Sequence, residues 1–279
     1  MVDLHTHSSA SDGTLSPREL VAHAAQHGLS TLALTDHDTV DGLAEAMRAG
    51  DEYGVRVIPG IEVELDHPRG AFHLLGIGLW RLDAAVEATL RELKRMRTER
   101  NIRMIAAAQN EGMPLQYHEL TTLAAGSTIG RPHFARLMVR KQLVANEQEA
   151  FERYLGDGRR LHVRRERLTL SDAIEMIHKA GGKAVLAHPL TLLLSWTQLE
   201  RQLRCWKDAG LDGVEAFHAN STLANARRIA KLAHELDLIV TAGSDFHGPD
   251  RADRQIGRGS EGMPIDEVCA LPFLPSTAI

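Results

Sequence analysis

The beginning of the chain carries residues that can ligate a metal ion. His5 and His7 are separated by one residue, so on a strand their imidazoles point to the same face. Asp12 follows on the loop after them. Two neutral imidazoles with a nearby carboxylate are the start of a metal site, although two unrelated histidines can share this spacing. The pattern becomes informative because almost every later predicted strand also ends in His, Asp or Glu.

The His, Asp and Glu residues that could ligate a metal ion stand at the ends of the predicted strands or on the first loop. In parallel α/β sheets and barrels, functional groups collect at the carboxyl ends of the strands. So many imidazoles and carboxylates on one rim would repel each other or stay unsatisfied without cations. The candidate metal ligands are His5, His7, Asp12, His37, Glu62, His73, His188, Asp245 and His247.

The number and type of these residues predict more than one ion. One ion takes about four to six ligands, and Glu62 has two oxygens with which to bridge a pair of ions. We expect two or three divalent ions, with Mn preferred and Fe, Zn or Mg as alternatives, because imidazole and carboxylate ligands are mixed. Clustered ions suit in-line phosphoryl transfer to a metal-bound water, which would be the nucleophile.

Strands and helices alternate in two stretches of the sequence. Strands are expected over residues 3–5, 30–35, 56–62, 71–77, 183–187, 213–217 and 238–242, and helices over 17–26, 40–53, 171–180, 196–209 and 223–236. This alternation predicts parallel strands in a right-handed α/β fold. Between the two stretches lie only predicted helices, over 84–110, 117–125, 132–141 and 147–155. We therefore expect an α/β body formed by residues 1–98 and 166–279, with a helical insertion at 99–165.

Composition and charge narrow the function further. The 279 residues are 43% hydrophobic and 25% charged, and no apolar run is long enough to cross a membrane. Without a secretory signal, and with Cys205 and Cys269 in no metal-binding spacing, a cytoplasmic protein is expected. Residues 81–170 carry a net charge of +6 and the remainder −11. The basic segment suits a phosphate-bearing partner, such as a nucleotide or a short single-stranded RNA end, whereas the acidic body argues against duplex DNA.

The ordered motifs resemble a known family. His-x-His, Asp, Thr-Asp-His, Gly-x-Glu, His, Ala-His-Pro and Gly-Ser-Asp-Phe-His follow one another as in the PHP (polymerase and histidinol phosphatase) superfamily of metal-dependent phosphoesterases. Within it, the chain is similar to the branch of 3′,5′-nucleotide bisphosphate phosphatases and 5′→3′ exoribonucleases. The resemblance implies a distorted (β/α)7 barrel with three ions. It implies that one ion binds His5, His7, Glu62 and Asp245, a second binds Glu62, His73 and His188, and a third binds Asp12, His37 and His247.

The resemblance also implies substrate-binding residues in the insertion. The segment Arg131-Pro132-His133-Phe134-Ala135-Arg136 resembles the family's Arg-x-His-Phe-Ala-Arg motif. Arg131 is expected to clamp a phosphate in a bidentate manner, and His133 to donate a proton or a hydrogen bond to it. Arg136 and Arg159 are further candidates. The family's Gly-Tyr and Gly-Arg-Tyr segments are replaced by Leu161-His162 and by residues 190–192, which leaves the substrate open.

These patterns predict hydrolysis of phosphate esters on nucleotides or short RNA ends. Histidinol phosphate phosphatase activity is the first alternative, although the insertion argues against it. Amide or deaminase-type hydrolysis in a metal barrel is the second, and it would need no arginine clamp. A non-catalytic, metal-stabilised module is the third, and the complete ligand set argues against it. The sequence does not decide the native metal, the length of the substrate or the oligomeric state.

Overall fold

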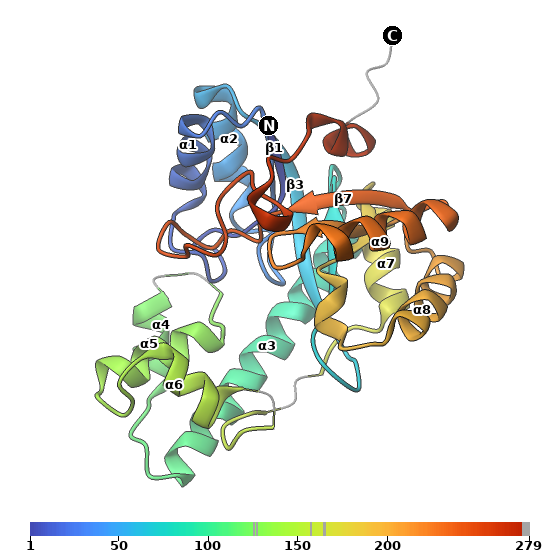
Figure 1. The fold of residues 1–279 in the computed structure, drawn as a ribbon. Coiled ribbons are helices and arrows are strands. Elements are labelled where there is room, and N and C mark those ends of the chain that lie inside the picture. Colours follow the sequence, from blue (N-terminus) through green and yellow to red (C-terminus); the bar gives the residue numbers. More distant parts are fainter. Residues whose placement is uncertain (125, 127, 157, 164–165, 275–279) are drawn as a thin grey trace. The chain divides into compact units, whose positions relative to one another are not determined.

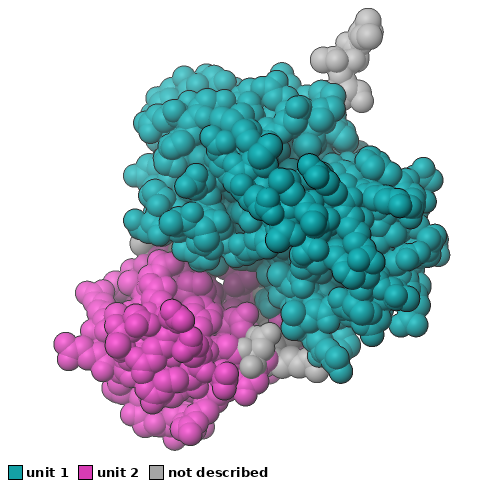
Figure 2. All heavy atoms as spheres, viewed as in Figure 1, with its two compact units in different colours: residues 1–90, 168–279 teal, residues 91–167 magenta. Residues whose placement is uncertain are grey.

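The computed structural model describes residues 1–124, 126, 128–156, 158–163 and 166–274. The chain forms two compact units, one of residues 1–90 and 168–279 and one of residues 91–167 (Figure 2). The segment 99–165 that the sequence sets apart as an insertion lies within the second unit. The predicted insertion boundary at residue 165 and the predicted helical residue 125 lie outside the described residues. No helix in the described part of the chain combines the length and the apolar character needed to cross a membrane.

The first unit is built around a seven-stranded sheet whose strands follow one another in chain order. The strands are β1 (Val2–Thr6), β2 (Thr31–Leu34), β3 (Arg56–Leu65), β4 (Phe72–Ile77), β5 (Lys183–Leu186), β6 (Gly213–His218) and β7 (Ile239–Gly243). The sheet curls until its two edges meet, because Thr6 pairs with Phe246 directly after β7. The His5 carbonyl accepts the Asp245 amide at 2.9 Å across this seam. The predicted seven-stranded α/β barrel is therefore confirmed, in a nearly closed form.

One strand runs against the prediction. The sequence alternation predicts parallel strands, but β4 is antiparallel to both β3 and β5. The reason is local, since only residues 66–71 separate β3 from β4 and no helix lies between them. A parallel connection needs a crossover of a dozen or more residues, whereas a short loop joins antiparallel strands. The start of β4 consequently lies at the rim where β2 and β3 carry their functional side chains.

Helices cover the outside of the barrel. They are α1 (Pro17–Gln26), α2 (Leu43–Tyr53), α7 (Leu170–Lys179), α8 (Trp196–Asp208) and α9 (Leu223–Glu235), with α1 and α2 beside β2 and β3 and with α7 and α9 along β4–β7 (Figure 1). Several begin with a side-chain cap, such as Ser16, which forms a capping box with Glu19. Buried aliphatic side chains such as Leu4, Ile58 and Leu75 fill the barrel core.

The second unit is helical. It contains most of α3 (Ala84–Asn110), then α4 (Tyr117–Ala124), α5 (Arg131–Arg140), the short α6 (Glu147–Ala150) and a single π-helical turn, Phe151–Leu155. Leu115, Leu120, Phe134 and Met138 are among the buried residues of its own hydrophobic core. The unit can therefore hold side chains of α3 and α4 in fixed positions around a pocket.

Candidate metal centre

The nine predicted metal ligands gather at one end of the barrel. His5 belongs to β1, His7 follows it, and His37 comes after β2, where it pairs with Glu62 of β3. His73 is at the start of β4, which reaches this end because that strand is antiparallel. His188 follows β5, Asp245 and His247 follow β7, and Asp12 lies on the loop after β1. Barrel closure thus brings together ligands as far apart in the sequence as His5 and His247, 242 positions.

Glu62 lies at the middle of the cluster. Its side chain is 1% exposed, and both of its oxygens face histidine rings. Oε1 lies 2.8 Å from His73 Nδ1 and 3.0 Å from His188 Nε2. Oε2 faces three more ring nitrogens, at 3.0 Å (His37 Nδ1), 3.3 Å (His7 Nε2) and 3.5 Å (His5 Nε2). A single carboxylate with both oxygens engaged in this way is suited to bridge two cations.

Two aspartates complete the cluster on either side of His7 and His247. Asp245 Oδ1 lies 3.2 Å from His7 Nε2 and 3.4 Å from His247 Nδ1. Asp12 lies 3.3 Å from His247 Nε2 and 3.8 Å from His37 Nε2. Ligating atoms of His7, Asp12, His37 and His247 all lie within 4.8 Å of one another, as do those of His5, His7 and Asp245.

Several atoms of the cluster are buried without a hydrogen bond in the described structure: His5 Nε2, both ring nitrogens of His7, and Glu62 Oε2. Leaving buried polar atoms unpaired costs free energy, and a cation that these lone pairs coordinate removes that cost. Mixed imidazole and carboxylate donors suit Mn, Fe or Zn. The residues present therefore fit a cluster of divalent ions.

The family follows from a match over the first part of the barrel and most of the helical unit. A family model for the PHP domain matches residues 3–157, more than half of the chain. The chain belongs to the PHP family. It is 37% identical over 247 residues to a 5'-3' exoribonuclease of Haemophilus influenzae, covering 88% of this chain and 90% of that protein. It is 34% identical over 265 residues to a 3',5'-nucleoside bisphosphate phosphatase of Chromobacterium violaceum, covering 95% of this chain and 93% of that protein.

Two solved structures have the same fold as this chain. A Bifidobacterium adolescentis protein described as a metal-dependent phosphoesterase superposes with a TM-score of 0.86 at 27% identity, covering 98% of this chain and 95% of that one. A Chromobacterium violaceum protein described as an amidohydrolase, with bound sulfate and no metal, superposes with a TM-score of 0.84 at 33% identity, covering 94% and 92%. The resemblance inferred from the ordered motifs is confirmed.

The PHP barrel also holds the candidate ligands in place through residues that were not among the predicted site residues. Glu215 of β6 accepts a hydrogen bond from His5 Nδ1 at 3.0 Å, and its other oxygen accepts the His188 amide at 2.8 Å. His5 is thereby fixed with Nε2 toward the cluster. Such outer partners commonly set the orientation of metal-binding histidines. The position of Glu215 in the sequence could have revealed this role, because Glu215 lies on a buried strand of this barrel.

Asp245 is held by two further residues that the sequence analysis passed over. The Asn220 amide donates to His218 Nδ1 at 3.1 Å, so the proton of this neutral ring belongs on Nε2, which donates to Asp245 Oδ2 at 3.4 Å. The Arg254 guanidinium contacts the same oxygen. These contacts leave Oδ1 directed at His7 and His247. His218 ends β6 as the other candidates end their strands, so position could have revealed it, whereas Arg254 lies in a loop without a recognisable pattern.

The hydrogen bonds of His188 leave its Nε2 and a Glu62 oxygen, both acceptors, facing each other, and a cation would fit between them. Thr191 Oγ1 donates to a carbonyl, either of Ala71 at 2.8 Å or of His188 itself at 2.9 Å. His188 Nδ1, 3.0 Å from this hydroxyl oxygen, must then carry the proton and donate it. The bare Nε2 lone pair is left 3.0 Å from Glu62 Oε1. Two acceptors at this distance repel each other unless a cation or an added proton lies with them.

The electrostatics of the cluster point the same way. Burial alone would raise the pKa of Glu62, but the surrounding His37, His73 and His5 hold that pKa well below its usual range. Burial alone would lower the pKa of His5, but Glu215, Glu62 and Asp245 raise it well above its usual value. Without metal the His5 imidazole thus attracts a proton. A divalent ion competes for the same lone pairs, so its binding releases protons.

Asp36 and Asp38 flank His37 in the chain. Asp36 accepts hydrogen bonds from the Ser8 amide at 2.8 Å, from the Ser8 hydroxyl at 2.6 Å and from the Ser11 hydroxyl at 2.6 Å. It therefore fixes the loop between His7 and Asp12. Asp38 Oδ1 accepts the Glu64 amide at 3.4 Å.

The four predicted substrate-binding residues all belong to the second unit. Arg131 begins α5 and contacts the Leu155 carbonyl at 3.4 Å. His133 is buried, and its Nδ1 accepts the Gly130 amide at 3.1 Å, which caps α5. Arg136 lies 3.9 Å from Glu147, and Arg159 is exposed on the loop after the π-helical turn. The structure thus gives His133 a capping contact, and the substrate-binding role of all four residues stays a prediction.

Proposed function

We propose that this PHP protein hydrolyses phosphate esters at the ends of nucleotides or short single-stranded RNA. The observation that carries the proposal is the buried Glu62 carboxylate, surrounded by five histidine rings and flanked by Asp12 and Asp245. Relatives named as an exoribonuclease and as a nucleoside bisphosphate phosphatase cover most of the chain. Both act on phosphate esters of nucleotides, and this shared chemistry is what we assign here.

The residues that would hold the ions fall into three sets around Glu62. The first set is His5, His7, Glu62 and Asp245, the second is Glu62, His73 and His188, and the third is Asp12, His37 and His247. Bound divalent ions would supply Lewis acidity to the phosphate oxygens and to the attacking water. We propose Mn as the native ion, with Fe, Zn or Mg as alternatives, because the donors are imidazoles and carboxylates.

The other residues prepare the site before any reaction. Glu215 holds the His5 ring so that Nε2 faces Glu62 and Asp245. Arg254 and His218 restrain Asp245 Oδ2 so that Oδ1 faces His7. Asp36 fixes the loop that carries Asp12. Preorganised groups of this kind need no rearrangement when charge develops on a phosphate in the transition state.

The insertion, which we propose spans residues 99–165, would act as a substrate cap. Arg131 is the first residue of α5, and its planar guanidinium would hold a substrate phosphate. His133 would add a hydrogen bond or a proton, and Arg136 and Arg159 would add positive charge. We further propose that the protein acts in the cytoplasm. We also propose that it does not bind duplex DNA, because its barrel is acidic.

Amide hydrolysis is a second candidate, favoured by one structural relative described as an amidohydrolase. The net charge of +6 over residues 81–170 favours the phosphate reading, since a neutral amide substrate needs no such charge. Histidinol phosphate is a third candidate, and it would not need the arginines of the insertion.

The deciding experiment compares three phosphate esters with the Mn-reconstituted full chain: adenosine 3′,5′-bisphosphate, a short 5′-phosphorylated RNA and histidinol phosphate. We expect turnover of a nucleotide or RNA substrate, lost in Asp245→Asn and reduced in Arg131→Ala. Arg140→Ala, at the other end of the same helix, is the matched control and should retain activity. Turnover of histidinol phosphate alone, indifferent to Arg131, would contradict the substrate assignment. Absence of turnover on all three with metal bound would contradict the phosphoesterase assignment.

A further inference from the structure

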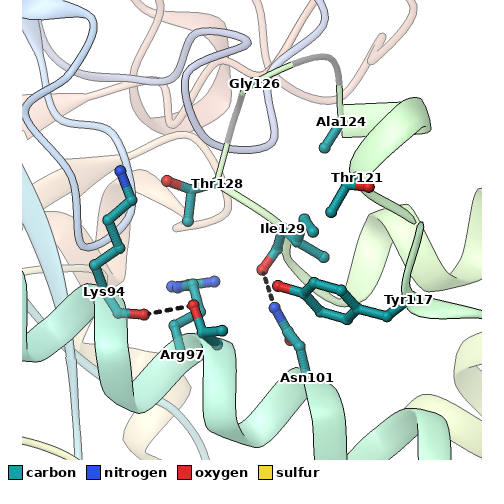
Figure 3. Close-up of a pocket in the computed structure, with 10 residues that line it drawn as sticks. Lys94, Arg97, Asn101, Tyr117, Thr121, Ala124, Gly126, Thr128 and Ile129 are labelled. Carbon is teal, nitrogen blue, oxygen red and sulfur yellow. Dashed lines mark hydrogen bonds between the residues drawn. The ribbon is translucent and has the colours of Figure 1, made fainter. Parts of the chain in front are cut away.

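A pocket within the helical unit is lined by none of the predicted metal ligands or substrate-binding residues. It measures about 190 Å³, and its lining includes Lys94, Arg97 and Asn101 of α3, Tyr117 of α4, and Ile129 (Figure 3). Pockets that bury a whole drug-sized ligand usually measure about 300–1,000 Å³. This pocket is smaller and so suits one compact group of a larger ligand.

Asn101 gives the pocket a polar requirement. Its side chain is 1% exposed, and its Nδ2 donates to the Ile129 carbonyl at 3.0 Å. That contact fixes the amide orientation, because a carbonyl accepts only from the NH₂ end. Asn101 Oδ1 is buried and has no hydrogen-bond partner among the described residues. A buried acceptor without a partner is unfavourable, so a bound group that fits here must present a hydrogen-bond donor.

The lining also favours a flat and electron-rich group. Lys94 and Arg97 are cationic, and the lining contains no acidic side chain. Tyr117 presents its ring to the same opening as the Asn101 amide, and Ile129 adds an apolar surface (Figure 3). A phosphate would suit the two cations but would place oxygen lone pairs against Asn101 Oδ1. A nucleobase has donors on its edge, and its faces stack on aromatic rings and on guanidinium planes.

We propose that this pocket is a base-binding subsite, which receives one nucleobase of a nucleotide or single-stranded RNA substrate. An amino or ring N–H group of the base donates to Asn101 Oδ1, and the base face packs against the Tyr117 ring. Lys94 and Arg97 provide the positive surroundings that suit the base and its adjoining phosphate. The inference rests on the proposed function, because it names the part of the substrate that the helical unit recognises.

The test is a binding measurement that does not depend on turnover. Titration calorimetry compares adenosine 5′-monophosphate with ribose 5-phosphate on the full-length, Mn-loaded protein. The two ligands carry the same phosphate, so contacts to that phosphate cancel in the ratio of their affinities. Stacking is worth about 1–3 kcal/mol per base, so we expect the nucleotide to bind about 5- to 150-fold more tightly.

Variants locate the preference in the pocket. Tyr117→Leu and Asn101→Leu should bring the affinity ratio close to one, whereas Tyr117→Phe, which keeps the ring, should retain it. Tyr154→Leu is the matched control, because Tyr154 packs against the same helical core but does not line the pocket. Urea unfolding confirms that each variant is folded.

Two results would overturn the subsite. A wild-type ratio near one, or a ratio that survives both Tyr117→Leu and Asn101→Leu, means that the base binds elsewhere or not at all. An equal loss of affinity for both ligands in these variants means that the pocket holds the phosphate. Failure of the proposed function is recognised separately, as absence of phosphate ester hydrolysis by a protein whose binding ratio is still measurable.

Discussion

Glu215→Gln provides a sharp test of how the barrel prepares its candidate metal ligands. The wild-type carboxylate accepts two hydrogen bonds, one from His5 Nδ1 at 3.0 Å and one from the His188 amide at 2.8 Å. Glutamine has nearly the same shape but only one acceptor oxygen, so its NH₂ group must face one of these two donors. If the NH₂ faces His5, the ring must carry its proton on Nε2, and the lone pair that faces Glu62 and Asp245 is lost. If it faces His188, a buried amide loses its acceptor.

Either outcome weakens metal binding more than it weakens the fold. Loss of such an outer partner typically costs 10- to 100-fold in metal affinity, which corresponds to about 1.4–2.7 kcal/mol. The assay is a competition titration of Mn against a chelator at fixed pH, together with urea unfolding of the metal-free protein. Glu235→Gln, a half-exposed position on α9, is the matched control and should leave the affinity unchanged. A folded Glu215→Gln protein whose Mn affinity stays within twofold of wild type would refute the reasoning.

Three further predictions concern the same barrel. Asp3→Asn should lower the free energy of unfolding, measured by urea titration, by about 1–3 kcal/mol, although the two side chains have the same shape. Backbone amides donate to both oxygens of Asp3, so one of these amides would face the new NH₂ group. Unchanged stability would contradict this account. Gly243→Ala should lose Mn binding and stability, measured by titration and thermal unfolding, because the new methyl group would overlap His5 Cβ and Glu215 Oε1; a variant that binds Mn as tightly as wild type would contradict this account. Mn at 100 times its dissociation constant should stabilise the protein by about 2.7 kcal/mol, and a melting temperature indifferent to Mn and to chelator would argue against a metal centre.

The sequence predicts the barrel well because strand and helix patterns are local. The capping box at Ser16 and Glu19 fixes where α1 begins, and the motifs ending in His37 and Asp245 sit directly after buried strands. Such signals depend on a few neighbouring residues, so they survive without knowledge of the fold. The direction of β4 depends instead on the short connection from β3, which the alternation of strands and helices does not represent.

The outer partners were harder to predict because their role exists only after the barrel closes. Glu215 reaches His5 across 210 positions of sequence, and Arg254 reaches Asp245 from a loop. Nothing in the spacing of these residues distinguishes them from ordinary buried or surface charges. The Asn101 acceptor is similar, since the orientation of its amide depends on a hydrogen bond to Ile129, 28 positions away, and Oδ1 has no partner among the residues that the structure describes.

The reversed β4 also explains how the barrel can surround one carboxylate so completely. In an all-parallel barrel, His73, near the start of its strand, would lie at the end opposite to His37 and His188. The antiparallel pairing places His73 opposite Glu64, two residues along β3 from Glu62, so His73 and Glu62 share a face of the sheet. This register brings His73 Nδ1 to 2.8 Å from Glu62 Oε1. The same oxygen receives His188 from β5, the strand that pairs with β4 on its other side. One hairpin therefore lets three neighbouring strands direct their ligating groups at one bridging carboxylate.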